Sequence, residues 1–190
     1  MSVVLASASP RRSELLQMLG VRDFLICPAK GEEKAEEGKS PADIVCSLSA
    51  AKAEEVRANF GEDDIVIAAD TIVWCADRVF GKPKSEDEAK RMLKELSGKS
   101  HEVYTGITLI KGEKIVSEAE CTKVHFRQLE DEEIEAYVKS GEPMDKAGAY
   151  GIQGKASLFA ECIEGDFFNV MGLPLCKLGK MLKTIGVSLL

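Results

Sequence analysis

The chain has 190 residues, of which 45% are hydrophobic and 30% charged, with a formal net charge of −7 and an isoelectric point near 5.1. This length and composition are those of a single soluble globular domain, residues 1–190, that is long enough to bury a core. The acidic balance argues against a sequence-independent nucleic-acid binder, and since no apolar run has membrane-spanning length we expect no membrane partner.

The first predicted elements are a short buried strand at residues 3–6 and a helix at residues 10–19, with Ser9 at its N-cap. Arg11 and Arg12 fall in the first helical turn, where the helix dipole slightly disfavours cations. This placement favours a phosphate-binding turn, in which a polyanion receives the helix N–H groups and both guanidinium groups. A solvated pair of arginines is the alternative.

The rest of the chain alternates between strand and helix patterns. The expected face of the second helix consists of Ile44, Val45, Leu48, Ala51 and Val56. The predicted elements are strands at 24–28, 65–69 and 72–74, a helix from Pro41, a helix behind a Ser85–Glu88 capping box that stops at Gly98, a strand pair within 102–126 that turns at 111–114, a helix at 131–138, an irregular stretch at 144–154, a strand at 158–163 and a helix at 173–185. The pattern predicts an α/β fold with a mixed, twisted sheet flanked by helices.

Six cysteines are scattered along the chain without a CxxC pair or zinc spacing. Because most lie inside apolar patterns, we expect buried, reduced thiols and a cytoplasmic location.

Asp70 directly follows the apolar run at 65–69, so we expect it at the carboxyl edge of the sheet, where α/β proteins bind ligands. A carboxylate there suits a Mg²⁺ ligand or a general base acting on water, and a turn-forming Asp is the alternative. Glu32 and Glu33, in a charged loop, include a second candidate ligand. Lys52, on the apolar side of its helix, and Lys82, before a proline, could reach a ligand, although lysines often reach solvent from such positions.

The segment 145–154 has glycines at every third position, a spacing that would let backbone approach a ligand closely. Within it, Gln153 offers the donor and acceptor needed to read a base edge. The Walker-like run 97–100 lacks the first glycine and follows a helix, and His101 and His125 have no metal or triad spacing, so a histidine-based nucleophilic mechanism is not expected.

Taken together, separated segments of the chain resemble the Maf family of nucleoside triphosphate pyrophosphatases nearly end to end. The matching segments are LASASPRR at 5–12, EE at 32–33, AAKA at 50–53, AADT at 68–71, GKP at 81–83, LSGKSHEVYTG at 96–106, DKAGAYGIQG at 145–154 and VMGLPL at 170–175. The resemblance implies a fold like that of inosine-triphosphate pyrophosphatase, with a cleft between two lobes. It also implies hydrolysis of a nucleoside triphosphate to the monophosphate and pyrophosphate with a divalent metal cation, Mg²⁺ or Mn²⁺. The AYGIQG form of the late segment resembles the branch that acts on dTTP and UTP.

Carried over by position, Asp70 resembles the catalytic residue of the family, and Glu33 and Asp70 resemble its metal ligands. The positions that resemble its phosphate-binding residues are Ser7, Arg11, Arg12, Lys52 and Lys82, and those that resemble its base-specificity residues are Arg12, Thr71 and Gln153. Ala68 stands where the family often has glycine, a small departure that leaves Asp70 in place.

The chemistry agrees with these roles, since fixed cations and a metal stabilise the charge that builds on the phosphates and on leaving pyrophosphate. We expect a nucleoside triphosphate as the partner and nucleotide-pool house-cleaning as the role. Two alternative functions stay open, namely a nucleotide- or protein-binding regulator of cell division and the same chemistry on a modified nucleotide. A homodimer is plausible, although no residue of the sequence indicates it.

Overall fold

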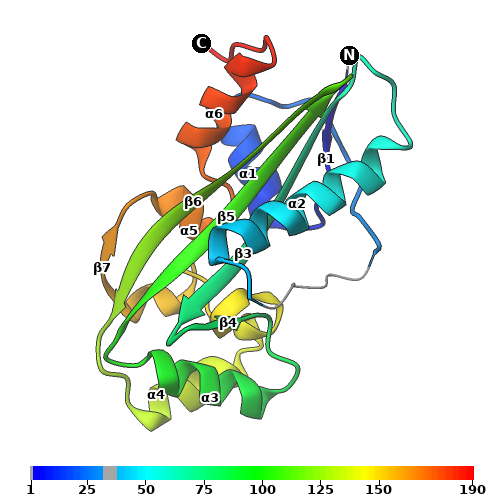
Figure 1. Cartoon of the computed structure of the whole chain (residues 1–190). Coiled ribbons are helices and arrows are strands. Elements are labelled where there is room, and N and C mark those ends of the chain that lie inside the picture. Colours follow the sequence, from blue (N-terminus) through cyan, green and yellow to red (C-terminus); the bar gives the residue numbers. More distant parts are fainter. Residues whose placement is uncertain (1, 32–37) are drawn as a thin grey trace. The chain divides into compact units, whose positions relative to one another are not determined.

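The computed structural model describes residues 2–31 and 38–190 (Figure 1). Its strands are β1 (Val3–Leu5), β2 (Phe24–Ile26), β3 (Ile65–Cys75), β4 (Arg78–Phe80), β5 (Ser100–Lys111), β6 (Lys114–Phe126) and β7 (Ala160–Glu164). The α-helices are α1 (Pro10–Met18), α2 (Pro41–Arg57), α3 (Glu86–Leu96), α4 (Asp131–Lys139), α5 (Phe167–Met171) and α6 (Leu175–Thr184). Three 3₁₀ helices complete the set: η1 (Glu142–Asp145), η2 (Ala147–Ala149) and η3 (Lys155–Leu158).

The strands of the described residues form one mixed sheet in the order β2-β1-β3-β5-β6-β7, with β4 paired to β3. β1 pairs in parallel with both β2 and β3, whereas β3–β4 and β6–β7 are antiparallel. The predicted mixed sheet with flanking helices is therefore confirmed.

The chain divides into two compact units. The first contains residues 1–70, 105–120 and 172–190, and the second contains residues 71–104 and 121–171. The long strands β3, β5 and β6 each contribute residues to both units.

The core of the first unit lies between its strands and α2. Small and branched side chains from both elements meet there, including Val4, Ala6, Ala53, Val56 and Val66. A Cβ added at Gly106 on β5 would collide with the backbone of α2 at Val45 and Cys46, so the absence of a side chain lets the helix lie close to the sheet. Alternate residues such as Leu5 and Ile67 point to the opposite face and are also buried, so both faces are covered.

The predicted face of α2 needs one correction, because Ala51 is exposed. Ser49 is buried instead, and its hydroxyl lies 2.9 Å from the hydroxyl of Thr108 on β5. A hydroxyl can occupy this core position because its partner on the sheet satisfies it, which apolar periodicity does not reveal.

The second unit is built around α3, α4 and a group of aromatic rings. Figure 1 shows α3 and α4 side by side, and the two helices are in contact. The predicted α3 start is confirmed, since the Ser85 hydroxyl accepts from the N–H of Glu88 at 3.2 Å. In the same unit, four rings pack edge to face with centroids 4.8–5.9 Å apart, namely those of Phe126, Tyr150, Phe159 and Tyr137.

Two further expectations about local structure are wrong. Strand β3 does not break at Asp70 but continues to Cys75, where a turn at Ala76 and Asp77 leads into β4. The cysteines are not mostly buried, because Cys121, Cys162 and Cys176 are exposed, and no disulfide forms among the described residues. Among residues 2–31 and 38–190, no helix is long and apolar enough to cross a membrane.

Candidate active site

The first candidate feature is the connection between β1 and α1 in the first unit. Ser7 is 7% exposed, and its hydroxyl accepts from the backbone N–H of Ser9 at 3.2 Å and from Nη1 of Arg12 at 3.0 Å. Nε of Arg12 also donates to the carbonyl of Gly172 at 2.8 Å. Arg12 is therefore held from two sides, so its guanidinium has a defined position in the first turn of α1.

The start of α1 agrees with the sequence prediction in its geometry. Ser9 is the N-cap with Pro10 at the first helical position, but the Ser9 side chain makes no capping hydrogen bond. The first turn contains no acidic residue, and it carries the half-buried Arg11 and Arg12. Helix N–H groups and two guanidinium groups at one helix end make this turn suited to an anion.

The second feature is an ion pair between Lys52 on α2 and Asp70 on β3. Nζ of Lys52 lies 2.5 Å from Oδ1 of Asp70, and the two side chains are 16% and 8% exposed. A positive charge this close offsets the negative charge of a carboxylate that the fold removes from water. The ammonium group of Lys52 therefore pairs with a buried carboxylate, and most of the Lys52 side chain is removed from solvent.

These two features belong to neighbouring parallel strands. Leu5 on β1 pairs with Ile67 on β3, and the N–H of Ala6 donates to the carbonyl of Ile67 at 2.8 Å. β1 ends there, so Ser7 and Asp70 both lie beyond the carboxyl end of the parallel pair. Asp70 is inside its own strand, contrary to the prediction, yet it still occupies the edge at which β1 stops.

The remaining predicted residues are distributed as follows. Thr71, half-buried on β3, and Lys82 and Gln153, both exposed, belong to the second unit. Glu32 and Glu33 lie outside the described residues. The structure thus joins Ser7 with Arg12 and Lys52 with Asp70.

The described end of the charged loop is attached to α2. The carboxylate of Glu55 accepts from the backbone N–H groups of Lys30 and Gly31 at 2.7 and 3.0 Å. These two hydrogen bonds lower the pKa of Glu55 below its ordinary value. Lys30 and Gly31 are therefore attached to the helix that also carries Lys52.

The fit of a divalent cation depends on the carboxylates available. Among the described residues, no group of three His, Cys, Asp or Glu side chains is arranged to hold a metal. Asp70 is a buried oxygen donor, and Mg²⁺ is commonly held by one or two carboxylates together with substrate phosphates. The donor chemistry of Asp70 therefore fits Mg²⁺ or Mn²⁺ with substrate phosphates completing the coordination.

The glycine-rich segment gives a clear correction. A Cβ at Gly148 would meet the side chain of Val73, one at Gly151 would meet Lys146, and one at Gly154 would meet the carboxylate of Glu142. These contacts are all within the second unit. The glycines therefore make room for the protein's own side chains, whereas the sequence suggested room for a ligand.

His101 is a buried group that sequence reasoning gave no role. It is 2% exposed, its Nε2 lies 2.7 Å from the hydroxyl of Tyr150, and in the described part of the chain its Nδ1 has no hydrogen-bond partner. Burial, with a smaller effect from the charge of His125, lowers the pKa of His101 from 6.5 to about 4. Tyr150 precedes Gly151 in the glycine-rich segment, so this hydrogen bond connects β5 to that segment.

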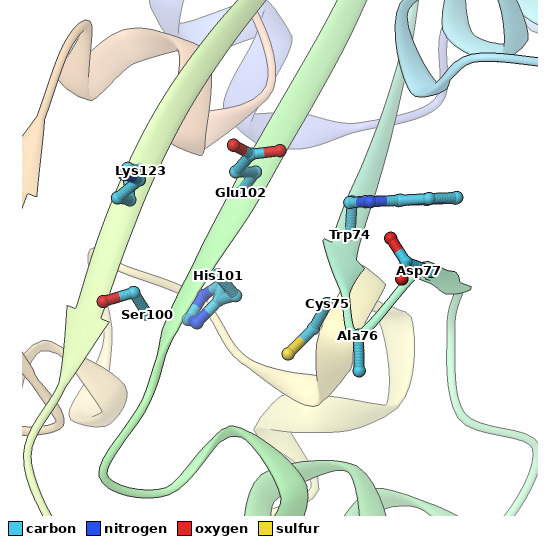
Figure 2. Close-up of a pocket in the computed structure, with 8 residues that line it drawn as sticks. All are labelled: Trp74, Cys75, Ala76, Asp77, Ser100, His101, Glu102 and Lys123. Carbon is cyan, nitrogen blue, oxygen red and sulfur yellow. The ribbon is translucent and has the colours of Figure 1, made fainter.

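The second unit also contains a pocket that the predicted residues do not line (Figure 2). Trp74 to Asp77 come from the end of β3 and its turn, Ser100 to Glu102 from β5, and Lys123 from β6. Nearby, Nδ1 of His125 lies 2.6 Å from the Ser100 hydroxyl and its Nε2 lies 2.5 Å from Oε1 of Glu164. Ser100, His125 and Glu164 lie on three separate strands, β5, β6 and β7, so the sequence does not indicate that they meet. Their side chains come together at an exposed surface.

The mixed sheet with its flanking helices defines the chain as an α/β protein. A solved structure of a HAM1 protein from Coxiella burnetii is similar to this chain, with a TM-score of 0.54 and 16% identity over 97% of this chain and 99% of the other. This likeness shows the fold.

The family follows from the sequence match. The Maf-like protein family model matches residues 2–185, and the chain belongs to this family. It is 50% identical over 186 residues to the dTTP/UTP pyrophosphatase of Bacillus cereus (strain B4264), covering 98% of this chain and 96% of the relative. The dTTP/UTP pyrophosphatase of Bacillus thuringiensis subsp. konkukian (strain 97-27) matches with the same identity and coverage.

Proposed function

We propose that this protein hydrolyses dTTP and UTP to the monophosphate and pyrophosphate, and so removes these nucleotides from the pool. The observation that carries the proposal is the buried Lys52–Asp70 ion pair beyond the end of β1, next along the sheet to the Ser7–Arg12 turn. It occurs in a chain that is 50% identical to relatives named for this activity.

The phosphate end of the substrate is assigned to the cations. Arg11 and Arg12 offer guanidinium forks at a helix N-terminus, Ser7 orients Arg12, and Lys52 and Lys82 add ammonium groups. Charge on the phosphoryl oxygens and on the leaving pyrophosphate rises as the α–β phosphoanhydride bond breaks. Fixed cations stabilise that charge more than they stabilise the ground state, which lowers the barrier.

Asp70 is assigned to the attacking water. Its carboxylate orients the water or takes its proton as oxygen bonds to the α-phosphorus, and the electron pair of the broken bond leaves with pyrophosphate. Asp70 and Glu33 would hold a divalent cation, which when bound offsets phosphate charge as a Lewis acid. Lys52 keeps the Asp70 carboxylate in one orientation, as expected of a charge-assisted hydrogen bond at 2.5 Å.

The base is assigned to Gln153, with Thr71 and Arg12 as further specificity positions. An amide offers one donor and one acceptor side by side, which match the O4 and N3–H edge of uracil and thymine. Gln153 is exposed, so its amide is available to a ligand.

The test is pyrophosphate release by the purified protein with Mg²⁺ or Mn²⁺ from dTTP, UTP, CTP, dCTP, GTP, ATP, ITP and 7-methyl-GTP. Release led by dTTP and UTP is the expected result. Faster release from ITP or 7-methyl-GTP than from dTTP and UTP would support the type of reaction but refute the role of Gln153. The absence of release from every nucleotide would refute the enzyme and favour a binding protein that regulates cell division.

A further inference from the structure

The exposed side chain of Gln153 sits on a tight turn of the second unit. The N–H of Gly154 donates to the carbonyl of Gly151 at 3.0 Å, which closes residues 151–154 into a turn. Ile152 points into the core and is 7% exposed, whereas Gln153 is exposed. The direction of the Gln153 amide therefore depends on how the two ends of this turn are held.

Both ends are held by one pair of side chains. The N–H of Gly151, two residues before Gln153, donates to the hydroxyl of Tyr137 at 3.2 Å. The N–H of Lys155, two residues after Gln153, donates to Oε2 of Glu142 at 3.2 Å. The Tyr137 hydroxyl donates to Oε1 of Glu142 at 3.1 Å, so the two anchors are connected to each other.

The anchors themselves are fixed. Tyr137 on α4 is 3% exposed, and its ring packs edge to face on Phe159 with centroids 5.1 Å apart. The backbone carbonyl of Glu142 accepts from Nζ of Lys146 at 2.6 Å. The Glu142 carboxylate lies where a Cβ of Gly154 would be, although Gly154 has a φ of −95° that other residues can adopt. A side chain at this position would therefore have to displace the Glu142 carboxylate.

We propose that Tyr137 and Glu142 are positioning residues for base selection, which set the direction of Gln153 without touching the substrate themselves. The inference rests on the proposed function, in which Gln153 reads the base. A two-point hydrogen bond to a base edge tolerates little displacement, so a looser turn weakens discrimination between bases. The residues assigned to the phosphates belong to other segments, and a looser turn leaves them unchanged.

The decisive variant is Tyr137→Phe, which removes one hydroxyl and keeps the packed ring. The measurement is kcat and KM for dTTP and for dCTP, because cytosine presents an amino donor where thymine presents the O4 acceptor. We expect the ratio of kcat/KM for dTTP to that for dCTP to fall about fivefold to thirtyfold, the change that 1–2 kcal/mol produces. The change should lie in the KM for dTTP, with kcat within about twofold of wild type.

Tyr104→Phe is the matched control. The Tyr104 hydroxyl also donates to a carboxylate of the second unit, Oε2 of Glu102 at 2.9 Å, but it lies on β5 and not on the turn. This variant should keep the wild-type ratio. Gly154→Ala is the second test, since its methyl group displaces the Glu142 carboxylate and should lower the ratio in the same way if Tyr137→Phe fails to fold.

An unchanged ratio in the folded Tyr137→Phe and Gly154→Ala variants would overturn the inference, as would an equal loss of kcat for every nucleotide. These outcomes differ from failure of the proposed function, in which the wild-type protein itself releases no pyrophosphate from dTTP or UTP.

Discussion

Mild acid should destabilise the protein through His101. The imidazole is 2% exposed and lies edge-on to Phe126 and Tyr150. Protonation would place a charge among apolar rings, which is why burial lowers the pKa of His101 from 6.5 to about 4. In the unfolded chain the same imidazole is in water and binds a proton near its ordinary pKa.

The sign and size of the effect follow from these two values. Below pH 6.5 the imidazole of the unfolded state binds a proton, whereas the imidazole of the folded state stays neutral down to about pH 4. The contribution of His101 to the free energy of unfolding is therefore full above pH 6.5 and falls as the pH drops through this window. A difference of about 2.5 pKa units at 1.36 kcal/mol per unit is about 3 kcal/mol in total. By about pH 5 the loss from this group should be about 2 kcal/mol.

The assay is urea unfolding of the wild type and of His101→Gln between about pH 7 and about pH 5. Carboxylates also respond to acid, so the informative quantity is the difference between the two proteins in the pH dependence of the unfolding free energy. His125→Gln removes the other histidine of the chain. In this variant the unfolding free energy should keep most of the pH dependence that it has in the wild type. Equal slopes for the wild type and His101→Gln would refute the reasoning.

Four further predictions concern the site and the core. Asp70→Asn should lower kcat about a hundredfold or more, and near-normal turnover would exclude its assigned role. Lys52→Met should lower the unfolding free energy by about 3 kcal/mol, because Asp70 then stays buried without its cation, and the double variant with Asp70→Asn should recover part of the loss in urea unfolding. EDTA should abolish pyrophosphate release and Mg²⁺ or Mn²⁺ should restore it, whereas full activity in EDTA would contradict the metal assignment. Gly106→Ala should destabilise by about 2–3 kcal/mol in the same unfolding assay, because the methyl group meets the α2 backbone. Gly179→Ala, with open space around it, is its control, and equal stability of the two variants would contradict the close contact of α2 with β5.

Local sequence signals predicted most of the secondary structure. The start of α1 at Pro10 with Ser9 as its cap, the Ser85 cap of α3 and the β5–β6 turn are all where the sequence indicated. Each depends on neighbours within a few residues, since caps and turns are satisfied by nearby backbone. α5 was not predicted, because at Phe167–Met171 it is too short for helical periodicity to show.

The continuity of β3 could not be predicted in the same way. Asp70 and Thr71 interrupt an apolar run and suggested a break, yet the strand continues because β4 pairs with its far end. The turn between them uses positive φ values at Ala76 and Asp77, and glycine, the usual sign of such a turn, is absent from both positions. The strand pairing, and not the local propensity, sets the length of β3.

The sequence by itself determined the family, the mixed sheet and the residue types that a phosphate site requires. Only the tertiary structure decided that Lys52 pairs with Asp70 and that Ser7 holds Arg12, because these contacts join elements whose spacing in the chain carries no signal. The glycines at 148, 151 and 154 illustrate the same division. The spacing of these glycines indicates a segment that something approaches closely. Only the structure shows that the side chains of Val73, Lys146 and Glu142 occupy the space beside them.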